Sequence, residues 1–113
     1  MIRVVFQATD AGRPRGLEVN GHAGLSEAGS DIVCAAVSVL AENLVAGLRG
    51  LLKQTPEVVT GNGRLECRMA EADLSYESDL LFASAMLGLK AVALQYPERV
   101  IIVESERGPT ETA

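Results

Sequence analysis

The chain of 113 residues is 48% hydrophobic and 22% charged, which is the balance of one soluble globular domain. Its formal net charge of −5 disfavours binding to nucleic acids, because an acidic surface repels their phosphates. The same charge would suit a basic protein partner, and it is also ordinary for a soluble protein. Tryptophan is absent and aromatic residues make up only 4%, so we expect an aliphatic core.

The start of the chain does not resemble a secretory signal, because residues 1–9 lack a small-residue cleavage site. We therefore expect a cytoplasmic protein in which Cys34 and Cys67 are reduced thiols. The most apolar stretch, 32–52, is not expected to span a membrane, because polar residues interrupt it. These are Ser38, Glu42, Asn43 and Arg49.

The first part of the chain predicts a β-hairpin. Residues 1–9 are apolar and β-branched, as is typical of a strand, and 11–16 (AGRPRG) have the composition of a turn. Residues 17–21 alternate between apolar and polar, which predicts a second strand. The small residues of 23–30 then predict a flexible, glycine-containing loop.

A long helix is predicted from about Asp31 to Lys53, ending before Pro56. Either Ser30 or Asp31 can cap its start by accepting a hydrogen bond from an exposed main-chain N–H. Its apolar residues recur at three- and four-residue steps. They are Val33, Val37, Leu40, Leu44, Leu48 and Leu51.

Another hairpin is predicted after this helix. Residues 57–60 and 64–70 have strand composition, and Gly-Asn-Gly at 61–63 is a strong signal for the turn between them. Residues 100–103 predict a short apolar last strand. The polar residues 107–113 are expected to form a disordered tail.

A second helix is predicted between Ser75, which can cap its start, and Tyr96, which precedes a proline. One of its faces is apolar. This face carries Leu80, Ala83, Leu87, Ala91 and Leu94. Both predicted helices bear apolar residues on more than one face, and a single sheet cannot cover all of them. We therefore expect a homodimer with helix surface in its interface.

The predicted order of elements is strand, strand, helix, strand, strand, helix, strand (ββαββαβ). This order favours an α+β sandwich in which two long helices pack on one mixed or antiparallel sheet. We expect a single domain over residues 1–106, with no repeat and no second domain.

His22 and Cys34 form the candidate reactive pair. His22 is the only histidine and ends the second predicted strand, while Cys34 lies in the first turn of the first predicted helix. A thiol becomes a strong nucleophile when it ionises, and a helix N-terminus stabilises a nearby thiolate. An imidazole can accept the thiol proton and later return it to a leaving amine, while main-chain N–H groups at the helix start can hold an oxyanion.

Two further polar residues lie near the candidate nucleophile. Asp31, Cys34 and Ser38 share one face of the predicted helix. Ser38 interrupts an otherwise apolar run, which indicates that this face meets a polar site. Asp31 has two possible roles, orienting His22 or capping the helix, because a carboxylate beside a thiolate would oppose its ionisation.

These residues also have ordinary structural explanations. A lone histidine after a strand is often a turn residue, and a cysteine in an apolar helix is often a small buried hydrophobe. Cys67, between two charged residues of a predicted strand, is expected only to pack. The single histidine and the two cysteines, spaced 12 and 33 residues apart, do not match a zinc site. No glycine-rich nucleotide fingerprint is present, so no metal or cofactor is expected.

A more specific pattern joins Gly21-His22-Ala23-Gly24 to residues 31–38 (DIVCAAVS) through a short gap. This pattern resembles the motif of the ribosomal-processing cysteine proteases, the Prp family, and the resemblance extends to about residue 105. It implies that His22 and Cys34 are the catalytic dyad.

The same resemblance implies supporting positions at Gly21, Asp31 and Ser38, all of which fit the family motif. It also implies a homodimeric α/β protein with a mobile loop between the two catalytic residues, here 23–30.

Members of the Prp family remove a short N-terminal extension from the twenty-seventh protein of the large ribosomal subunit, cutting after an apolar, aromatic-rich sequence. The resemblance therefore implies a hydrolase that acts on a basic ribosomal protein during ribosome assembly. The alternative is a non-catalytic ribosome-assembly or peptide-binding factor with the same cleft. A structural dimerisation domain is a third hypothesis, supported only by the apolar helices.

Overall fold

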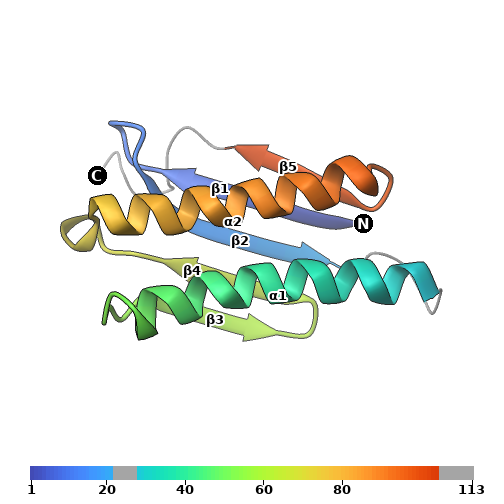
Figure 1. Cartoon of the computed structure of the whole chain (residues 1–113), viewed down its shortest axis with the longest axis horizontal. Coiled ribbons are helices and arrows are strands. Elements are labelled where there is room, and N and C mark those ends of the chain that lie inside the picture. The colour runs from blue at the N-terminus through green and yellow to red at the C-terminus, as the bar shows by residue number, and fades with distance from the viewer. Residues whose placement is uncertain (22–27, 105–113) are drawn as a thin grey trace.

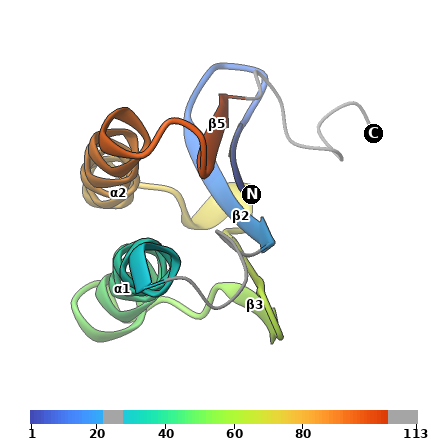
Figure 2. The ribbon, with the colours of Figure 1, turned by 90° about the vertical axis from the view of Figure 1, so that its right-hand side faces the viewer.

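The computed structural model describes residues 1–21 and 28–104, and only the main chain of residues 28–31. Two long helices lie on one face of a five-stranded sheet, so the molecule has two layers (Figures 1 and 2). The element order ββαββαβ and the α+β class are confirmed, with one short 3-10 helix, η1 (Glu71–Asp73), before the second long helix.

The bounds of the elements are as follows. The strands are β1 (Ile2–Ala8), β2 (Pro14–Gly21), β3 (Glu57–Gly61), β4 (Arg64–Arg68) and β5 (Val100–Glu104), and the long helices are α1 (Ala28–Gly50) and α2 (Tyr76–Gln95). The sheet order is β3-β4-β2-β1-β5. Only β1 and β5 pair in parallel, so the sheet is mixed.

The first hairpin is confirmed, but β2 begins at Pro14, inside the segment predicted as a turn. The turn is shorter because Thr9 and Arg13 close it. The Thr9 N–H donates to the Arg13 carbonyl at 2.8 Å, and the Arg13 N–H donates to Thr9 Oγ1 at 3.1 Å. The chain therefore reverses within three residues, with Gly12 at φ 87°.

The start of α1 corrects the sequence prediction. The helix begins at Ala28, so Ser30 and Asp31 are first-turn residues and neither is the N-cap. Residues 28–30 are helical rather than part of the predicted loop, and residues 23–27 lie outside the described residues.

The end of α1 lies at Gly50, earlier than predicted. Lys53 adopts a left-handed conformation (φ 57°), and the N–H of Gln54 donates to the carbonyl of Leu48 at 2.9 Å. This closure satisfies a helix-end carbonyl and turns the chain toward β3.

The ends of α2 are those predicted. The Ser78 N–H donates to Ser75 Oγ at 3.1 Å, and the Ser75 N–H donates to Ser78 Oγ at 2.9 Å, which forms a capping box. The helix ends at Gln95 with Tyr96 as its C-cap. The second hairpin and the last strand are also confirmed, and the predicted tail 107–113 lies outside the described residues.

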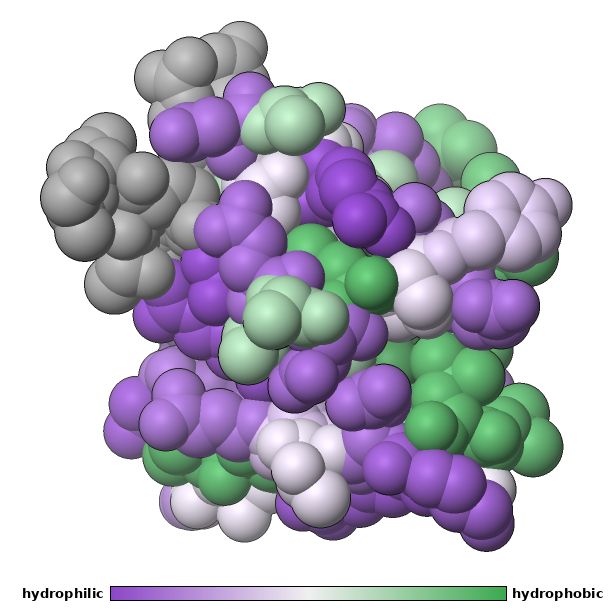
Figure 3. All heavy atoms as spheres, turned by 90° about the vertical axis from the view of Figure 1, so that its left-hand side faces the viewer, coloured by the Kyte–Doolittle hydropathy of each residue, from purple (hydrophilic) through white to green (hydrophobic). Residues whose placement is uncertain are grey.

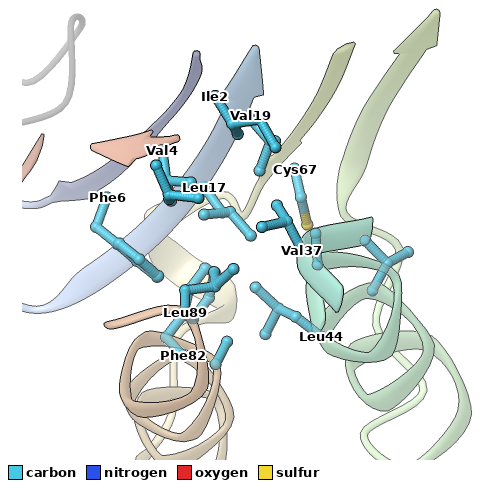
Figure 4. Packing of buried hydrophobic residues seen from close by; sticks show 14 of the residues in the cluster. Ile2, Val4, Phe6, Leu17, Val19, Val37, Leu44, Cys67, Phe82 and Leu89 are labelled. Atoms are coloured by element: carbon cyan, nitrogen blue, oxygen red, sulfur yellow. The ribbon is translucent and has the colours of Figure 1, made fainter. Parts of the chain in front are cut away.

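The core between the layers is aliphatic, as predicted, with Phe6 and Phe82 as its aromatic members. Side chains from the sheet meet those of both helices (Figure 4). The labelled ones are Ile2, Val4, Phe6, Leu17, Val19 and Cys67 from the sheet, Val37 and Leu44 from α1, and Phe82 and Leu89 from α2.

One segment of α1, Ile32–Gly50, is long and apolar enough to cross a membrane by length and composition alone, with a mean hydropathy of 1.6. A third of the segment is buried in the fold. Its buried residues belong to the core, and packing on the sheet explains their apolar character. They are Val33, Val37, Ala41, Leu44, Val45 and Leu48.

Candidate active site

A pocket of about 230 Å³ opens between α1 and the tip of the β3–β4 hairpin. Cys34 and Ser38 line it from α1, and Gly21 lines it from the end of β2. The structure therefore brings together three residues of the predicted site. The lining also includes aliphatic side chains, those of Ile2, Val19, Val37, Ala41 and Leu65.

Cys34 is a half-buried thiol in the second turn of α1, six residues after the helix begins at Ala28. The prediction that it lies in the first turn is wrong. The partial positive charge of a helix N-terminus falls off within the first turn, so α1 stabilises a thiolate here less than the sequence suggested. The exposed N–H groups of the helix start also precede Cys34 by about a turn.

Gly21 fixes the end of β2 at the pocket. Its φ of 100° lies in a region that favours glycine, and a Cβ at this position would overlap the carbonyl oxygen of Met1. Its N–H donates to the carbonyl of Gly63 at 2.8 Å, which ties β2 to the hairpin tip. The next residue in the chain, His22, lies outside the described residues.

The two supporting residues of α1, Asp31 and Ser38, are described to different extents: Ser38 with its side chain, Asp31 by its main chain alone. Ser38 follows Cys34 by about one helical turn and lies exposed at the pocket. Of Asp31 only the main chain is described, within the first turn. The capping role suggested for Asp31 is excluded, because α1 begins three residues earlier, so its orienting role remains as the other hypothesis.

Sequence reasoning missed the contribution of the second hairpin. Residues 61–63 were predicted only as a turn, yet Gly61, Gly63 and Arg64 line the pocket. The pairing of β4 with β2 sets Arg64 opposite Asn20 and carries the hairpin tip to the end of β2. No local signal reveals this contact, because it depends on pairing between strands more than 40 residues apart.

The polar residues that line the pocket are Cys34, Ser38, Glu42, Thr60 and Arg64. Arg64 Nε donates to a carboxylate oxygen of Glu66 at 2.8 Å, which holds the guanidinium on the outer side of β4. Among the side chains of residues 1–21 and 32–104, no cluster of histidine, cysteine and carboxylate groups is suited to a metal ion.

The second cysteine packs in the core, as predicted. Cys67 is 1% exposed, and its sulfur points from β4 toward α1 (Figure 4). Burial raises the pKa of the Cys67 thiol to about 11, although the positive charge of Arg49 partly opposes this shift. The thiol is therefore neutral at physiological pH and unsuited to nucleophilic attack.

Alkylation should distinguish the two thiols. With iodoacetamide at pH 8, we expect one modification per folded chain, at Cys34, because Cys67 is both buried and neutral. Peptide mass mapping locates the label, and denatured protein should show both cysteines modified. Labelling of Cys67 at the rate of Cys34 in folded protein would contradict the assigned burial.

Comparison with known proteins adds a decisive observation to this geometry. The family model for cysteine protease Prp matches residues 1–101, which include β1 to β4, both long helices and the pocket. The chain belongs to the cysteine protease Prp family. The resemblance drawn from the motif around Gly21 and Cys34 is thereby confirmed, and the chain is a cysteine protease by family.

Relatives agree in sequence and in fold. The ribosomal processing cysteine protease Prp of Staphylococcus aureus strain Mu50 is 26% identical over 102 residues, which cover 88% of this chain and 95% of the relative. The crystal structure of SMU.848 from Streptococcus mutans has a TM-score of 0.84 at 33% identity, covering 92% of this chain and 93% of that one.

One of the similar solved structures contains a peptide. The S. aureus protease Prp, described as essential, was solved in complex with a covalently linked product peptide. It has a TM-score of 0.83 at 25% identity and covers 93% of this chain and all of its own.

Proposed function

We propose that this chain removes a short N-terminal extension from the twenty-seventh protein of the large ribosomal subunit, in the cytoplasm, during ribosome assembly. Cys34 is the nucleophile and His22 the base. The proposal rests mainly on one observation: the half-buried Cys34 thiol lines a pocket that Gly21, the residue preceding His22, also lines. The covalently linked product peptide of the S. aureus relative supports attack by a cysteine.

The chemistry proceeds in two steps. His22 accepts the Cys34 proton, the thiolate attacks the scissile carbonyl, and the C–N bond breaks as His22 returns the proton to the leaving amine. Water, deprotonated by His22, then attacks the thioester, which releases the acyl fragment as a carboxylic acid and restores the thiol.

The supporting residues act through position. Gly21 directs the chain into His22 with a backbone conformation and a close approach to Met1 that favour glycine. Ser38 offers a hydroxyl at the pocket about one turn from Cys34. Asp31 orients the imidazole of His22.

The walls of the pocket favour an apolar residue beside the cut bond. Val19, Val37 and Leu65 provide an aliphatic lining next to Cys34, and the volume of about 230 Å³ leaves room for a large side chain. A net charge of −5 also favours a basic ribosomal protein as the substrate. We therefore assign the pocket to an apolar substrate side chain.

The direct test is incubation of the purified chain with the host's ribosomal protein carrying its native N-terminus, followed by intact-mass measurement. We expect loss of an N-terminal fragment after an apolar residue. Binding without any change in mass would favour the alternative, a non-catalytic assembly or peptide-binding factor.

We also propose that the chain forms a homodimer through α2. The leucine seam, defined as Leu80, Ala83, Leu87, Ala91 and Leu94, runs along one face of this helix. Leu80 is 50% exposed, Leu87 73% and Leu94 83%, and both alanines are exposed. In Figure 3, much of the visible hydrophobic surface lies on the helix side, at right.

The spacing of the leucine seam favours a second copy as its partner. The positions are symmetric about Leu87, so two antiparallel α2 helices would set Leu80 against Leu94, Ala83 against Ala91, and Leu87 on the two-fold axis. The small alanines allow the helices to approach closely.

Analytical ultracentrifugation tests this dimer. We expect the unmodified chain to sediment at twice its mass of 11.9 kDa, and Leu87→Glu to sediment as a monomer, because it brings two carboxylates together at the axis. Leu51→Glu is the matched control, since Leu51 is 74% exposed just after the end of α1, outside the leucine seam. A Leu87→Glu variant that remains dimeric would exclude this interface.

A further inference from the structure

The edge of the sheet beside the pocket is open. β3 is the first strand in the sheet order and, among the described residues, pairs only with β4. In an antiparallel pair, alternate residues direct their N–H and C=O groups to the neighbouring strand. Because a two-residue turn joins Gly61 to Arg64, Val58 and Thr60 direct theirs away from β4, to the open edge.

A second pocket, of about 320 Å³, lies between α1 and this edge. Val45 and Ala46 line it from α1, and Val58 lines it from β3. The helix layer leaves room here, because the main chain of α2 approaches β2 and β5 closely, whereas α1 approaches no described strand to the same degree. In Figure 2, α1 lies over the β3 side of the sheet and α2 over the β5 side.

The two pockets adjoin one another. Glu42, Thr60 and Leu65 line both of them, and together the pockets form a groove that follows β3 from Cys34. Arg49 lies at the far end of this groove, 15 residues along α1 from Cys34. At the helical rise per residue this separation is about 22 Å, which corresponds to about six to seven residues of extended peptide.

We propose that about six residues of the substrate, on one side of the cleaved bond, bind along β3 as an added strand of the sheet. The peptide pairs with the main chain of Val58 and Thr60, and every second side chain enters the groove between α1 and β3. This proposal rests on the proposed function and extends it from the cut residue to an extended recognition site.

The charge and polarity of the groove determine which substrate side chains it prefers. Between its two ends the groove is lined by aliphatic side chains, including Val45 and Val58, which favour apolar side chains at alternate substrate positions. Glu42, at the junction of the two pockets, favours a lysine or arginine that flanks the cut bond. A substrate peptide that binds through its main chain needs no single fixed sequence. The side chains at these alternate positions then determine which peptides the groove prefers.

The first test fills the groove. Ala46 is exposed and lines it, so Ala46→Phe should raise the KM for a synthetic peptide spanning the ribosomal cleavage site by about tenfold or more. The kcat should change by less than about twofold, because Ala46 lies three helical turns from Cys34. Ala72→Phe is the matched control, since Ala72 is exposed in η1 and lines none of these pockets, and it should leave both constants unchanged.

The second test examines main-chain pairing by changing the peptide. The only substitution in the protein is Cys34→Ala, which prevents cleavage. The same peptide is N-methylated at one residue at a time, and its affinity for the Cys34→Ala variant is measured by fluorescence anisotropy. If the peptide pairs as a strand, N-methylation at every second residue, over about six residues, should weaken binding about tenfold. N-methylation at the residues in between should change the affinity little. NMR spectra of the complex should show the largest shifts at the Val58 and Thr60 amides.

The outcomes separate the two proposals. Cleavage that is insensitive to Ala46→Phe, together with N-methyl effects that lack a period of two, would overturn the β3 site and leave the proposed function standing. Binding along β3 without cleavage by the unmodified chain would count against the proposed function alone. Failure of the peptide to bind at all would contradict both.

Discussion

Replacement of Cys34 by alanine is expected to abolish peptide cleavage, lowering kcat/KM by at least about a thousandfold, because the sulfur that forms the acyl-enzyme is lost. The fold should remain, since Cys34 is only half-buried at the pocket and lies outside the fully buried core. Cleavage of the ribosomal peptide, followed by mass spectrometry, measures the loss. Circular dichroism and thermal unfolding report the fold.

Two variants sharpen this experiment. Cys34→Ser should also be nearly inactive, because a hydroxyl ionises far less readily than a thiol. Cys67→Ala is the matched control for losing a thiol, and it should retain activity while losing about 1–2 kcal/mol of stability from the cavity it leaves. Normal processing by Cys34→Ala, or inactivation by a folded Cys67→Ala, would refute the assignment of the nucleophile.

Replacement of Gly21 by alanine is expected to lower the free energy of unfolding by about 2–3 kcal/mol and to reduce cleavage strongly. Two costs add at this position. A φ of 100° is unfavourable for alanine, and its Cβ would overlap the carbonyl oxygen of Met1. Relief of the overlap must displace β1 or the end of β2, and therefore the segment that leads to His22. Denaturant unfolding and peptide cleavage measure the two effects.

Two other glycines separate these costs. Gly12 has a φ of 87° with nothing near its Cβ position, so Gly12→Ala should show the cost of the backbone conformation alone, about 1–2 kcal/mol. Gly50 has neither a positive φ nor a close neighbour, so Gly50→Ala should be neutral or slightly stabilising. An equal loss of stability in Gly21→Ala and Gly12→Ala would show that the close approach to Met1 at Gly21 does not matter.

Local patterns in the sequence were sufficient to predict most of the elements. The capping box at Ser75, the end of α2 before a proline and the turn at 61–63 all depend on residues close together in the chain. The boundaries that failed include those at Pro14, Ala28 and Gly50, where the flanking residues fit either a loop or a regular element. Hydrogen bonding across the turn decided the first of these.

The sequence by itself was sufficient to propose the chemistry of the site. The spacing of Cys34 and Ser38 along a helix, and the placement of His22 directly after a strand that ends in Gly21, follow from local periodicity and from the family motif. The packing role of Cys67 was also predictable, because it occupies an inward position of a strand. These features need no knowledge of how the strands are ordered.

Only the tertiary structure decided the shape of the pocket. β4 pairs with β2 rather than β1, which carries the hairpin tip and Arg64 to the end of β2, and it leaves β3 as an open edge beside α1. Strand order is set by burial of the whole apolar face under two helices, a sum over residues far apart in the chain that no local pattern encodes. The true start of α1 likewise placed Cys34 a turn deeper in the helix, so the proposed activation of its thiol relies more on His22 than on the helix N-terminus.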